Sequence, residues 1–211
     1  MIFPITVIDN FFSDPDAIVE IASGLEYFSS DDGRWPGQRT RSFYEIDNKL
    51  YSFLVEKLFS IWYETMPSFI QMDMHFQIIN PFSEDKWDKM NRGWIHLDDS
   101  LFGGIIYLTK DPDPDTGTSI YKPKRGFAYV DNTEKVNLHT SNIKHPGIYS
   151  NGFDDMFDQY EETINVSNVY NRLLLFDGKT AHGVRTFGTK SRLTLPFIAH
   201  SCSSIPPLFR K

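Results

Sequence analysis

Residues 93–99 (Gly-Trp-Ile-His-Leu-Asp-Asp) constrain the fold of this chain more than any other stretch. Successive side chains of a β-strand alternate between its faces, so on a strand His96 and Asp98 point the same way and Leu97 points into the packing behind them. An imidazole and a carboxylate side by side can hold two adjacent positions on a metal ion. One further histidine would complete the set that suits non-haem Fe(II). We therefore expect a sheet that brings a distant histidine to this pair.

A candidate for the third ligand lies far downstream. An apolar run at residues 173–176 leads through a turn to His182, whose neighbours are alanine and glycine, small enough to let a bulky ligand approach. Ten residues after His182 stands Arg192, which shares a strand face with Thr194. A planar guanidinium is suited to binding a carboxylate through two parallel hydrogen bonds. The two segments together predict a metal site with a carboxylate site beside it.

The order of these motifs resembles that of the Fe(II)/2-oxoglutarate-dependent dioxygenase superfamily. The segments 103–108 (Gly-Gly-Ile-Ile-Tyr-Leu) and 117–121 (Gly-Thr-Ser-Ile-Tyr) are similar to the two strands that follow His-x-Asp in its prolyl-hydroxylase-like branch. The resemblance covers roughly residues 72–200 and is nearest to uncharacterised bacterial and phage members of that branch. It implies a double-stranded β-helix, that is, a cupin-like jelly roll, with the metal inside its mouth.

The resemblance also implies a role for each motif residue. Fe(II) would have three protein ligands: His96, Asp98 and His182. The co-substrate 2-oxoglutarate would chelate the iron and pair its distal carboxylate with Arg192, assisted by Thr194 and by the phenol of Tyr107. With O2, the reaction would decarboxylate 2-oxoglutarate to succinate and hydroxylate a C–H bond of an amino acid, a peptide or a protein side chain. Related halogenases carry a small residue in place of the carboxylate ligand, so Asp98 favours hydroxylation.

Length and charge narrow the classes of function. At 211 residues and 24.5 kDa the chain is long enough for one domain with a sizeable core. Its formal net charge of −7 and its pI near 5.3 argue against a broad surface for nucleic acids, which requires basic residues. The single cysteine, Cys202, fits a reducing compartment. Neither a signal peptide nor a membrane span is visible, so we expect a cytoplasmic protein.

The pattern of apolar residues predicts a mainly β fold with flanking helices (α+β). Helical spacing predicts helices at residues 14–28 and 47–65. Alternating or short apolar runs predict strands, chiefly at 2–8, 72–79, 102–109, 117–121, 162–166, 173–176, 183–187 and 191–198. We expect one oxygenase domain over residues 1–211, with a helical N-terminal support at 1–70 and the jelly-roll core at 72–200.

Five polar residues outside the motif are candidates for a place in the cavity. Arg39 and Arg41 share a face if their segment is extended, and they either meet an anionic substrate group or lie on a solvated loop. Gln77, Asn80 and Ser119 either reach 2-oxoglutarate or serve as ordinary polar packing groups. The sequence leaves both alternatives open.

Other metal-binding interpretations have less support. Asp99 faces away from Asp98 and is a second choice as ligand. His75 is a lone strand histidine, which is more often structural than ligating. The Asp-Pro-rich stretch 110–117 lacks the spacing and closing glutamate of an EF-hand, so it predicts a tight turn rather than a calcium loop.

The irregular stretch 122–160 contains two further histidines, His139 and His145. A long excursion inside a compact domain is typical of a functional lid or a disordered segment. The histidines are alternative ligands in principle, although no carboxylate pair stands near them.

Two rival functions fit parts of the pattern. A cupin-type metalloprotein, an isomerase or a metal-binding protein, would hold a metal without 2-oxoglutarate, and Arg192 would then have no assigned role. A non-catalytic jelly-roll module would keep the fold without the chemistry. The primary substrate and the oligomeric state cannot be deduced from the sequence.

Overall fold

The computed structural model of the protein describes residues 3–30, 35–125 and 156–204, so His139 and His145 lie outside the described residues. The strands in these ranges are β1 (Thr6–Ile8), β2 (Phe28–Ser29), β3 (Gln38–Arg39), β4 (Ile70–Met74), β5 (Gln77–Ile79), β6 (Phe102–Tyr107), β7 (Thr118–Pro123), β8 (Tyr160–Val166), β9 (Arg172–Asp177), β10 (Ala181–Val184) and β11 (Arg192–Cys202). The labelled α-helices are α1 (Pro15–Ser23), α2 (Phe43–Ile46) and α3 (Asn48–Phe59), residues 156–159 are helical as well, and two short 3-10 turns span Lys89–Asn91 and Pro114–Thr116.

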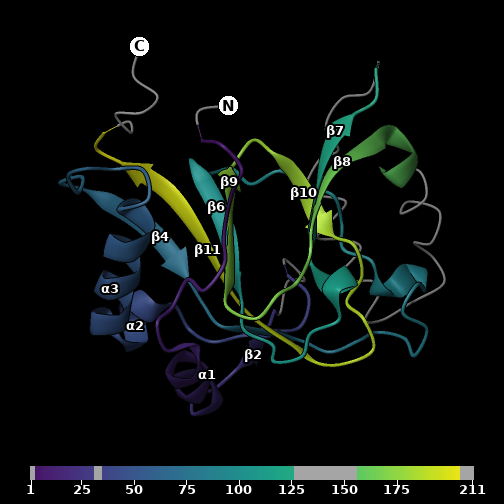
Figure 1. Ribbon diagram of the computed structural model, residues 1–211, viewed down its shortest axis with the longest axis horizontal. Coiled ribbons are helices and arrows are strands. Elements are labelled where there is room, and N and C mark those ends of the chain that lie inside the picture. The colour runs from purple at the N-terminus through teal and green to yellow at the C-terminus, as the bar shows by residue number, and fades with distance from the viewer. Residues whose placement is uncertain (1–2, 31–34, 126–155, 205–211) are drawn as a thin grey trace.

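The strands of the described ranges form two antiparallel sheets. The larger sheet has eight strands in the order β1-β9-β6-β11-β5-β3-β2, with β4 also paired to β11, and the smaller sheet has the order β10-β7-β8. In Figure 1 the two sheets face each other, and α2 and α3 lie on the outer side of the larger sheet next to β4 and β11. This arrangement confirms the expected mainly β fold with flanking helices.

The larger sheet buries apolar side chains on both of its faces. Along β6, Phe102 and Ile106 belong to a core shared with the helices, whereas Ile105 and Tyr107 pack in a core shared with the smaller sheet. Strand β9, which pairs along β6, alternates in the same way. This alternation is the period of two that a pleated strand imposes. Polar residues on the inner face therefore lie between the two sheets.

The first predicted helix begins where the sequence indicates. Asp14 caps α1 by accepting a hydrogen bond from the backbone N–H of Ala17 at 3.1 Å, and Pro15 occupies the first turn, where its missing N–H costs nothing. The helix ends at Ser23, before the predicted residue 28, because the following residues turn into β2. The N-cap of α1 was predictable from the sequence, whereas the end of α1 depends on the strand β2 and its pairing with β3.

The second predicted helix is also shorter than its apolar pattern indicates. α3 follows the cap residue Asp47 and ends at Phe59 rather than at residue 65. Trp62 is buried beyond the helix because its ring packs edge-on against Phe102, with 5.2 Å between the ring centroids. None of the helices in the described ranges has the length and the apolar content needed to cross a membrane.

The predicted strand at residues 72–79 is divided into β4 and β5. Both pieces pair with β11, β4 with its C-terminal half and β5 with its first three residues. Pro196 of β11 lies between the two pairings, and a proline has no N–H to donate to a ladder. The interruption lets His75 leave the regular ladder beside the cavity described below.

The N-terminal residues 1–70 contribute strands as well as helices. β1 pairs with β9, and β2 and β3 extend the larger sheet beyond β5. The register places Arg39 directly opposite Gln77. The larger sheet thus joins the two segments that the sequence separates into support and core.

Candidate active site

The backbones of His96 and His182 pair with each other in an isolated antiparallel bridge. The N–H of His96 donates to the carbonyl of His182 at 2.9 Å, and the reverse hydrogen bond measures 3.0 Å. The N–H of Asp98 donates to the carbonyl of Gly178 at 3.0 Å. The expected strand at His96 is therefore reduced to a single bridge, which still places the two histidines side by side.

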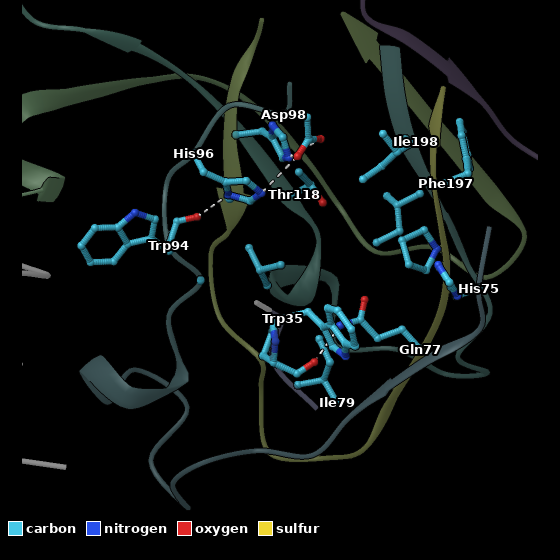
Figure 2. A pocket seen from close by; sticks show the side chains of 18 of the residues that line it. Trp35, His75, Gln77, Ile79, Trp94, His96, Asp98, Thr118, Phe197 and Ile198 are labelled. Atoms are coloured by element: carbon cyan, nitrogen blue, oxygen red, sulfur yellow. Dashed lines mark hydrogen bonds and ion pairs between the residues drawn. The ribbon is translucent and has the colours of Figure 1, made fainter. Parts of the chain in front are cut away.

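The side chains of the three predicted ligands converge. His96 Nε2 lies 3.7 Å from Asp98 Oδ1, and His182 Nε2 lies 3.6 Å from Asp98 Oδ2. Their potential ligand atoms all lie within 4.8 Å of one another, and Figure 2 shows His96 and Asp98 pointing toward each other at one end of a pocket. Two imidazoles and one carboxylate on one side of an ion leave its other positions open, which suits non-haem Fe(II).

Both imidazoles are oriented by a backbone carbonyl two residues earlier in the chain. Nδ1 of His96 lies 2.9 Å from the carbonyl oxygen of Trp94, and Nδ1 of His182 lies 2.9 Å from that of Thr180. A carbonyl only accepts, so Nδ1 carries a proton, and in the neutral imidazole Nε2 then carries the lone pair. This is the tautomer that a metal-binding histidine needs when Nε2 is the ligand atom.

Two glycines and one ring shape the surroundings of the ligand group. A Cβ on Gly103 would lie 3.2 Å from Asp98 Oδ2, and a Cβ on Gly183 would lie 3.0 Å from the carbonyl oxygen of Trp94. The ring of Phe176 packs against His182 at a centroid distance of 4.3 Å. Gly183 is therefore small because the backbone of Trp94 lies close to it. The sequence had suggested only that a small residue here leaves room for a ligand.

Arg192 and Thr194 stand on the inner face at the start of β11. Arg192 is 2% exposed, and its Nε and Nη2 atoms have no hydrogen-bond partner among the described residues. The hydroxyl of Thr194 is likewise buried without a partner in this part of the chain. Burial lowers the pKa of Arg192 from its ordinary value, and no described carboxylate opposes that effect. Donors buried in this way are costly to leave unpaired.

Tyr107 lies beside Arg192 but directs its hydroxyl elsewhere. The guanidinium carbon of Arg192 is 5.6 Å from the centre of the Tyr107 ring. The Tyr107 hydroxyl donates to Thr118 Oγ1 at 2.8 Å, and burial raises the pKa of the phenol. Thr118 also lines the cavity. The sequence did not single out Thr118, because residues 118–121 are all buried and the strand run alone does not tell whether Thr118 or Ser119 faces the cavity.

A cavity of about 440 Å³ joins the ligand group to Arg192. Its walls include Trp35, Arg39 and Gln77, together with apolar side chains such as Ile79 and Phe176. Figure 2 shows Trp35, Gln77 and Ile79 at the end of the pocket away from His96 and Asp98. The volume is in the range of sites that bind small molecules.

The five polar residues that the sequence offered as cavity candidates differ in whether they reach this cavity. Arg39 and Gln77 line it, whereas Arg41 is exposed with its guanidinium carbon 5.6 Å from the Phe28 ring. Asn80 is exposed, and Ser119 is turned to the other face of β7, where it donates to Glu162 at 2.8 Å. Of these five residues, only Arg39 and Gln77 contribute to the cavity wall.

The weaker ligand candidates lie outside the ligand group. Asp99 is exposed and pairs with Lys179 at 2.9 Å. His75 lines the cavity but places Nδ1 3.1 Å from the carbonyl oxygen of Thr40, and it is not part of the ligand group. Neither residue therefore competes with the three predicted ligands.

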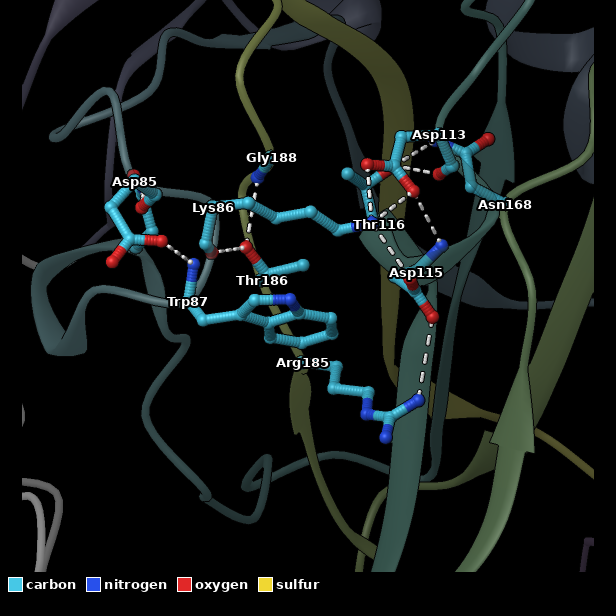
Figure 3. A network of polar contacts seen from close by, with 11 residues as sticks. Asp85, Lys86, Trp87, Asp113, Asp115, Thr116, Asn168, Arg185, Thr186 and Gly188 are labelled. Atoms are coloured by element: carbon cyan, nitrogen blue, oxygen red, sulfur yellow. Dashed lines mark hydrogen bonds and ion pairs between the residues drawn. The ribbon is translucent and has the colours of Figure 1, made fainter.

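A network of charged residues holds the loops around the site (Figure 3). Lys86 Nζ lies 2.7 Å from carboxylate oxygens of both Asp113 and Asp115, and Arg185 Nη1 lies 3.4 Å from Asp115. Thr186 Oγ1 donates to the carbonyl of Lys86 at 2.5 Å. The network joins the loop before His96, the turn at 110–117 and the segment after β10. The stretch 110–117 contains the short 3-10 turn Pro114–Thr116, in agreement with the expected tight turn, and its two aspartates pair with Lys86.

Comparison with solved structures places this fold among 2-oxoglutarate–Fe(II) oxygenases. HygX from Streptomyces hygroscopicus, solved with nickel and 2-oxoglutarate bound, is 13% identical over 93% of this chain and 82% of its own, with a TM-score of 0.58. A prolyl hydroxylase from Trichoplax adhaerens, in complex with a peptide fragment of hypoxia inducible factor, is 13% identical over 93% and 83%, with a TM-score of 0.55. A 2OG-Fe(II) oxygenase family oxidoreductase from Burkholderia pseudomallei is 12% identical over 95% and 86%, with a TM-score of 0.54. At such identities the likeness shows the fold.

Sequence comparisons add a family without a known activity. Residues 3–186 match the model of a family described as "Family of unknown function (DUF6445)". No curated protein matches the chain. The activity must therefore be argued from the site itself.

Proposed function

The chain belongs to the DUF6445 family, and we propose that this member is an Fe(II)/2-oxoglutarate-dependent dioxygenase. Fe(II) is bound by the three ligands His96, Asp98 and His182. The co-substrate 2-oxoglutarate, the iron and O2 supply the oxidative chemistry. The reaction is hydroxylation of a C–H bond coupled to decarboxylation of 2-oxoglutarate to succinate.

The burial of Arg192 without an anionic partner among the described residues is the observation that carries this proposal. Two nitrogens of the buried Arg192 guanidinium have no partner among the described residues, and burying such a cation costs several kcal/mol unless an anion compensates it. Arg192 shares its cavity with the His–Asp–His group, so the anion belongs to a molecule that also reaches the metal. A dicarboxylate such as 2-oxoglutarate meets both demands, with one carboxylate near the metal and the other on Arg192.

The neighbours of Arg192 complete the carboxylate site. The hydroxyl of Thr194 is a buried donor on the same strand face, two residues away. Thr118 Oγ1 accepts a hydrogen bond from the Tyr107 hydroxyl, so the Thr118 hydroxyl can donate toward the cavity that it lines. Tyr107 then acts through Thr118, rather than directly on the carboxylate as the family resemblance implies. Apolar walls such as Phe176 and Ile105 exclude water from the site.

We propose an amino acid, a peptide or a protein side chain as the primary substrate. HygX has also been solved with hygromycin B, and the Trichoplax hydroxylase binds a peptide fragment, so the shared fold accepts both small molecules and peptides. The net charge of −7 disfavours a nucleic acid as substrate. A cavity of about 440 Å³ has room for the co-substrate and one small group beside it.

The test is anaerobic addition of Fe(II) and 2-oxoglutarate, read by the visible charge-transfer absorbance of the chelate. We expect the band in the wild-type protein and its loss in Arg192→Met, which removes the charge but keeps a long apolar side chain. Arg172→Gln is the matched control, because Arg172 lies in the same sheet but pairs with Asp9. Iron binding without the band would support the metalloprotein that does not use 2-oxoglutarate. Absence of iron binding would support a non-catalytic module.

A further inference from the structure

The cavity contains a second arginine that the proposed co-substrate does not use. Arg39 lines the cavity from β3, and its buried Nε has no hydrogen-bond partner among the described residues. Its Nη2 donates to Gln77 Oε1 at 3.3 Å, a long hydrogen bond to a neutral acceptor. Burial lowers the pKa of Arg39 to about 10, so the side chain stays charged at neutral pH. Arg39 is therefore a cation in the cavity without an ion-pair partner in the part of the chain that is described.

The surroundings hold Arg39 in one orientation. Its guanidinium carbon lies 4.8 Å from the centre of the Trp35 ring, a cation–π contact that helps to hold the guanidinium in place. Gln77 donates its amide N–H to the carbonyl of Pro36 at 2.7 Å, which turns the amide oxygen toward Arg39. The main chains of Arg39 and Gln77 pair between β3 and β5. A cation fixed in this way is prepared to bind a ligand at little entropic cost.

The acidic side chains of the cavity are already engaged elsewhere. Asp98, the carboxylate whose charge acts on Arg39, is the proposed metal ligand. Asp73 lies 2.9 Å from His200 Nε2. His75 adds no further positive charge, because burial and then the charge of Arg39 lower its pKa. Once the metal is bound, Asp98 is engaged by it, and Asp73 is turned to His200 with its side chain 56% exposed.

A charge count of the loaded cavity points the same way. In the buried part of the loaded cavity the divalent metal and two arginines would carry four positive charges, whereas Asp98 and the two carboxylates of 2-oxoglutarate would carry three negative ones. The remaining acid of the cavity, Asp73, has a side chain that is 56% exposed, so solvent screens its charge. One positive charge is left over in the buried part, where Nε of Arg39 has no hydrogen-bond partner among the described residues. A low-dielectric cavity favours a ligand that brings the missing negative charge.

We infer that Arg39 binds a carboxylate of the primary substrate, with Trp35 and Gln77 as its positioning residues. The inference rests on the proposed function, since it places the substrate between Arg39 and the metal. In Figure 2, Trp35 and Gln77 lie at the end of the pocket away from His96 and Asp98. A substrate with its carboxylate on Arg39 thus directs another of its atoms toward the metal. The substrate class is then a carboxylic acid, such as a free amino acid or an acidic side chain.

The experiment uses a carboxylate probe and a paramagnetic metal. The full-length protein is loaded with Mn(II) and saturating 2-oxoglutarate, and fluorine-19 relaxation of trifluoroacetate is measured, with trifluoroacetamide as the neutral counterpart. We expect enhanced relaxation of the carboxylate probe only, and a roughly tenfold weaker effect in Arg39→Gln, the loss expected for one charge-assisted pair. Arg41→Gln is the matched control, because Arg41 is exposed outside the cavity. Arg39→Lys should recover part of the effect.

Two results would overturn the inference. One is equal relaxation of the two probes, and the other is an unchanged carboxylate effect in an Arg39→Gln protein that melts at the wild-type temperature. Failure of the proposed function is recognised separately, by absence of the Fe(II)–2-oxoglutarate absorbance band in the wild-type protein. In that case the probes are compared with Mn(II) alone, and loss of the carboxylate effect in Arg39→Gln still identifies an anion site.

Discussion

The cations of the cavity and the cation of the Lys86 network are treated in opposite ways by the fold. Lys86 has carboxylate oxygens of two aspartates at 2.7 Å, although its side chain is 24% exposed. Arg192 is 2% exposed, and two of its nitrogens have no partner among the described residues. Solvent could have satisfied Lys86 and cannot satisfy Arg192. The more buried cation is thus the less compensated one, which is the reverse of what stability alone would favour.

This difference separates two purposes of charge, one in the loops around the site and one in the cavity. The network uses its charges to join three loops, and its groups are satisfied within the chain. The cavity leaves donors of Arg192, Thr194 and Arg39 for a ligand. Loss of a cavity residue should therefore affect ligand binding, whereas loss of a network residue should affect the free energy of unfolding.

The largest effect is expected for His182→Ala. Removal of one of three protein ligands should lower the affinity for Fe(II) by more than the roughly 10–100-fold seen when an outer hydrogen-bond partner of a ligand is lost. Succinate formation should fall to background. Iron content and 2-oxoglutarate turnover measure both. His200→Ala is the control, because His200 is exposed and pairs with Asp73 outside the ligand group. Wild-type turnover in His182→Ala would refute the assigned site.

Arg192→Met should stabilise the ligand-free protein while it abolishes 2-oxoglutarate binding. Replacing an unpaired buried cation by an apolar side chain of similar length should raise the free energy of unfolding by about 1–3 kcal/mol. Urea denaturation measures it. Saturating Fe(II) and 2-oxoglutarate should raise the melting temperature of the wild-type protein and leave that of the variant unchanged. A destabilised variant would mean that Arg192 is satisfied within the protein.

Lys86→Met should have the opposite effect on stability and a small one on the cavity. It leaves the carboxylates of Asp113 and Asp115 facing each other without their shared cation, which should lower the free energy of unfolding by about 1 kcal/mol. Lys122→Met is the control, because the pair of Lys122 with Glu161 is exposed and should contribute little. Equal denaturation curves for both variants would show that the network adds no stability.

The smallest effect is the pH dependence of that contribution. Burial acts to raise the pKa of Asp113, but hydrogen bonds from Lys86 and from the Asp115 N–H outweigh it and hold the pKa below 3.8. Hydrogen bonds to the two aspartates likewise raise the pKa of Lys86 above 10.5, although burial acts to lower it. The stability contributed by Asp113 is complete above the unfolded pKa and is lost as pH falls through the lowered folded value. That of Lys86 is complete below 10.5 and is lost as pH rises through the raised value. The difference in the free energy of unfolding between wild type and Lys86→Met should therefore become smaller at both low and high pH. A difference that does not change with pH would exclude the ion pairs as its cause.

The convergence of His96, Asp98 and His182 on one cavity with Arg192 was predictable, because its signal is a set of residue types at characteristic separations. Thr118 and Ser119 show where that signal ends, since only one of two neighbouring strand residues faces the cavity. The strand run does not fix this parity, which depends on how β7 pairs with its partners. Arg39 could not be assigned either, because its place follows from the pairing of β3 with β5. Both failures concern long-range register, on which local patterns carry no information.

The backbone bridge between His96 and His182 has a consequence for how the protein acquires its metal. The two residues are held together by their own hydrogen bonds, and each imidazole is oriented by its own segment. An ion bound by these side chains would therefore enter a site that is already assembled. The geometry of the site and the cellular supply of metals would together decide which ion occupies it, and an ion lost during purification should be replaceable without refolding.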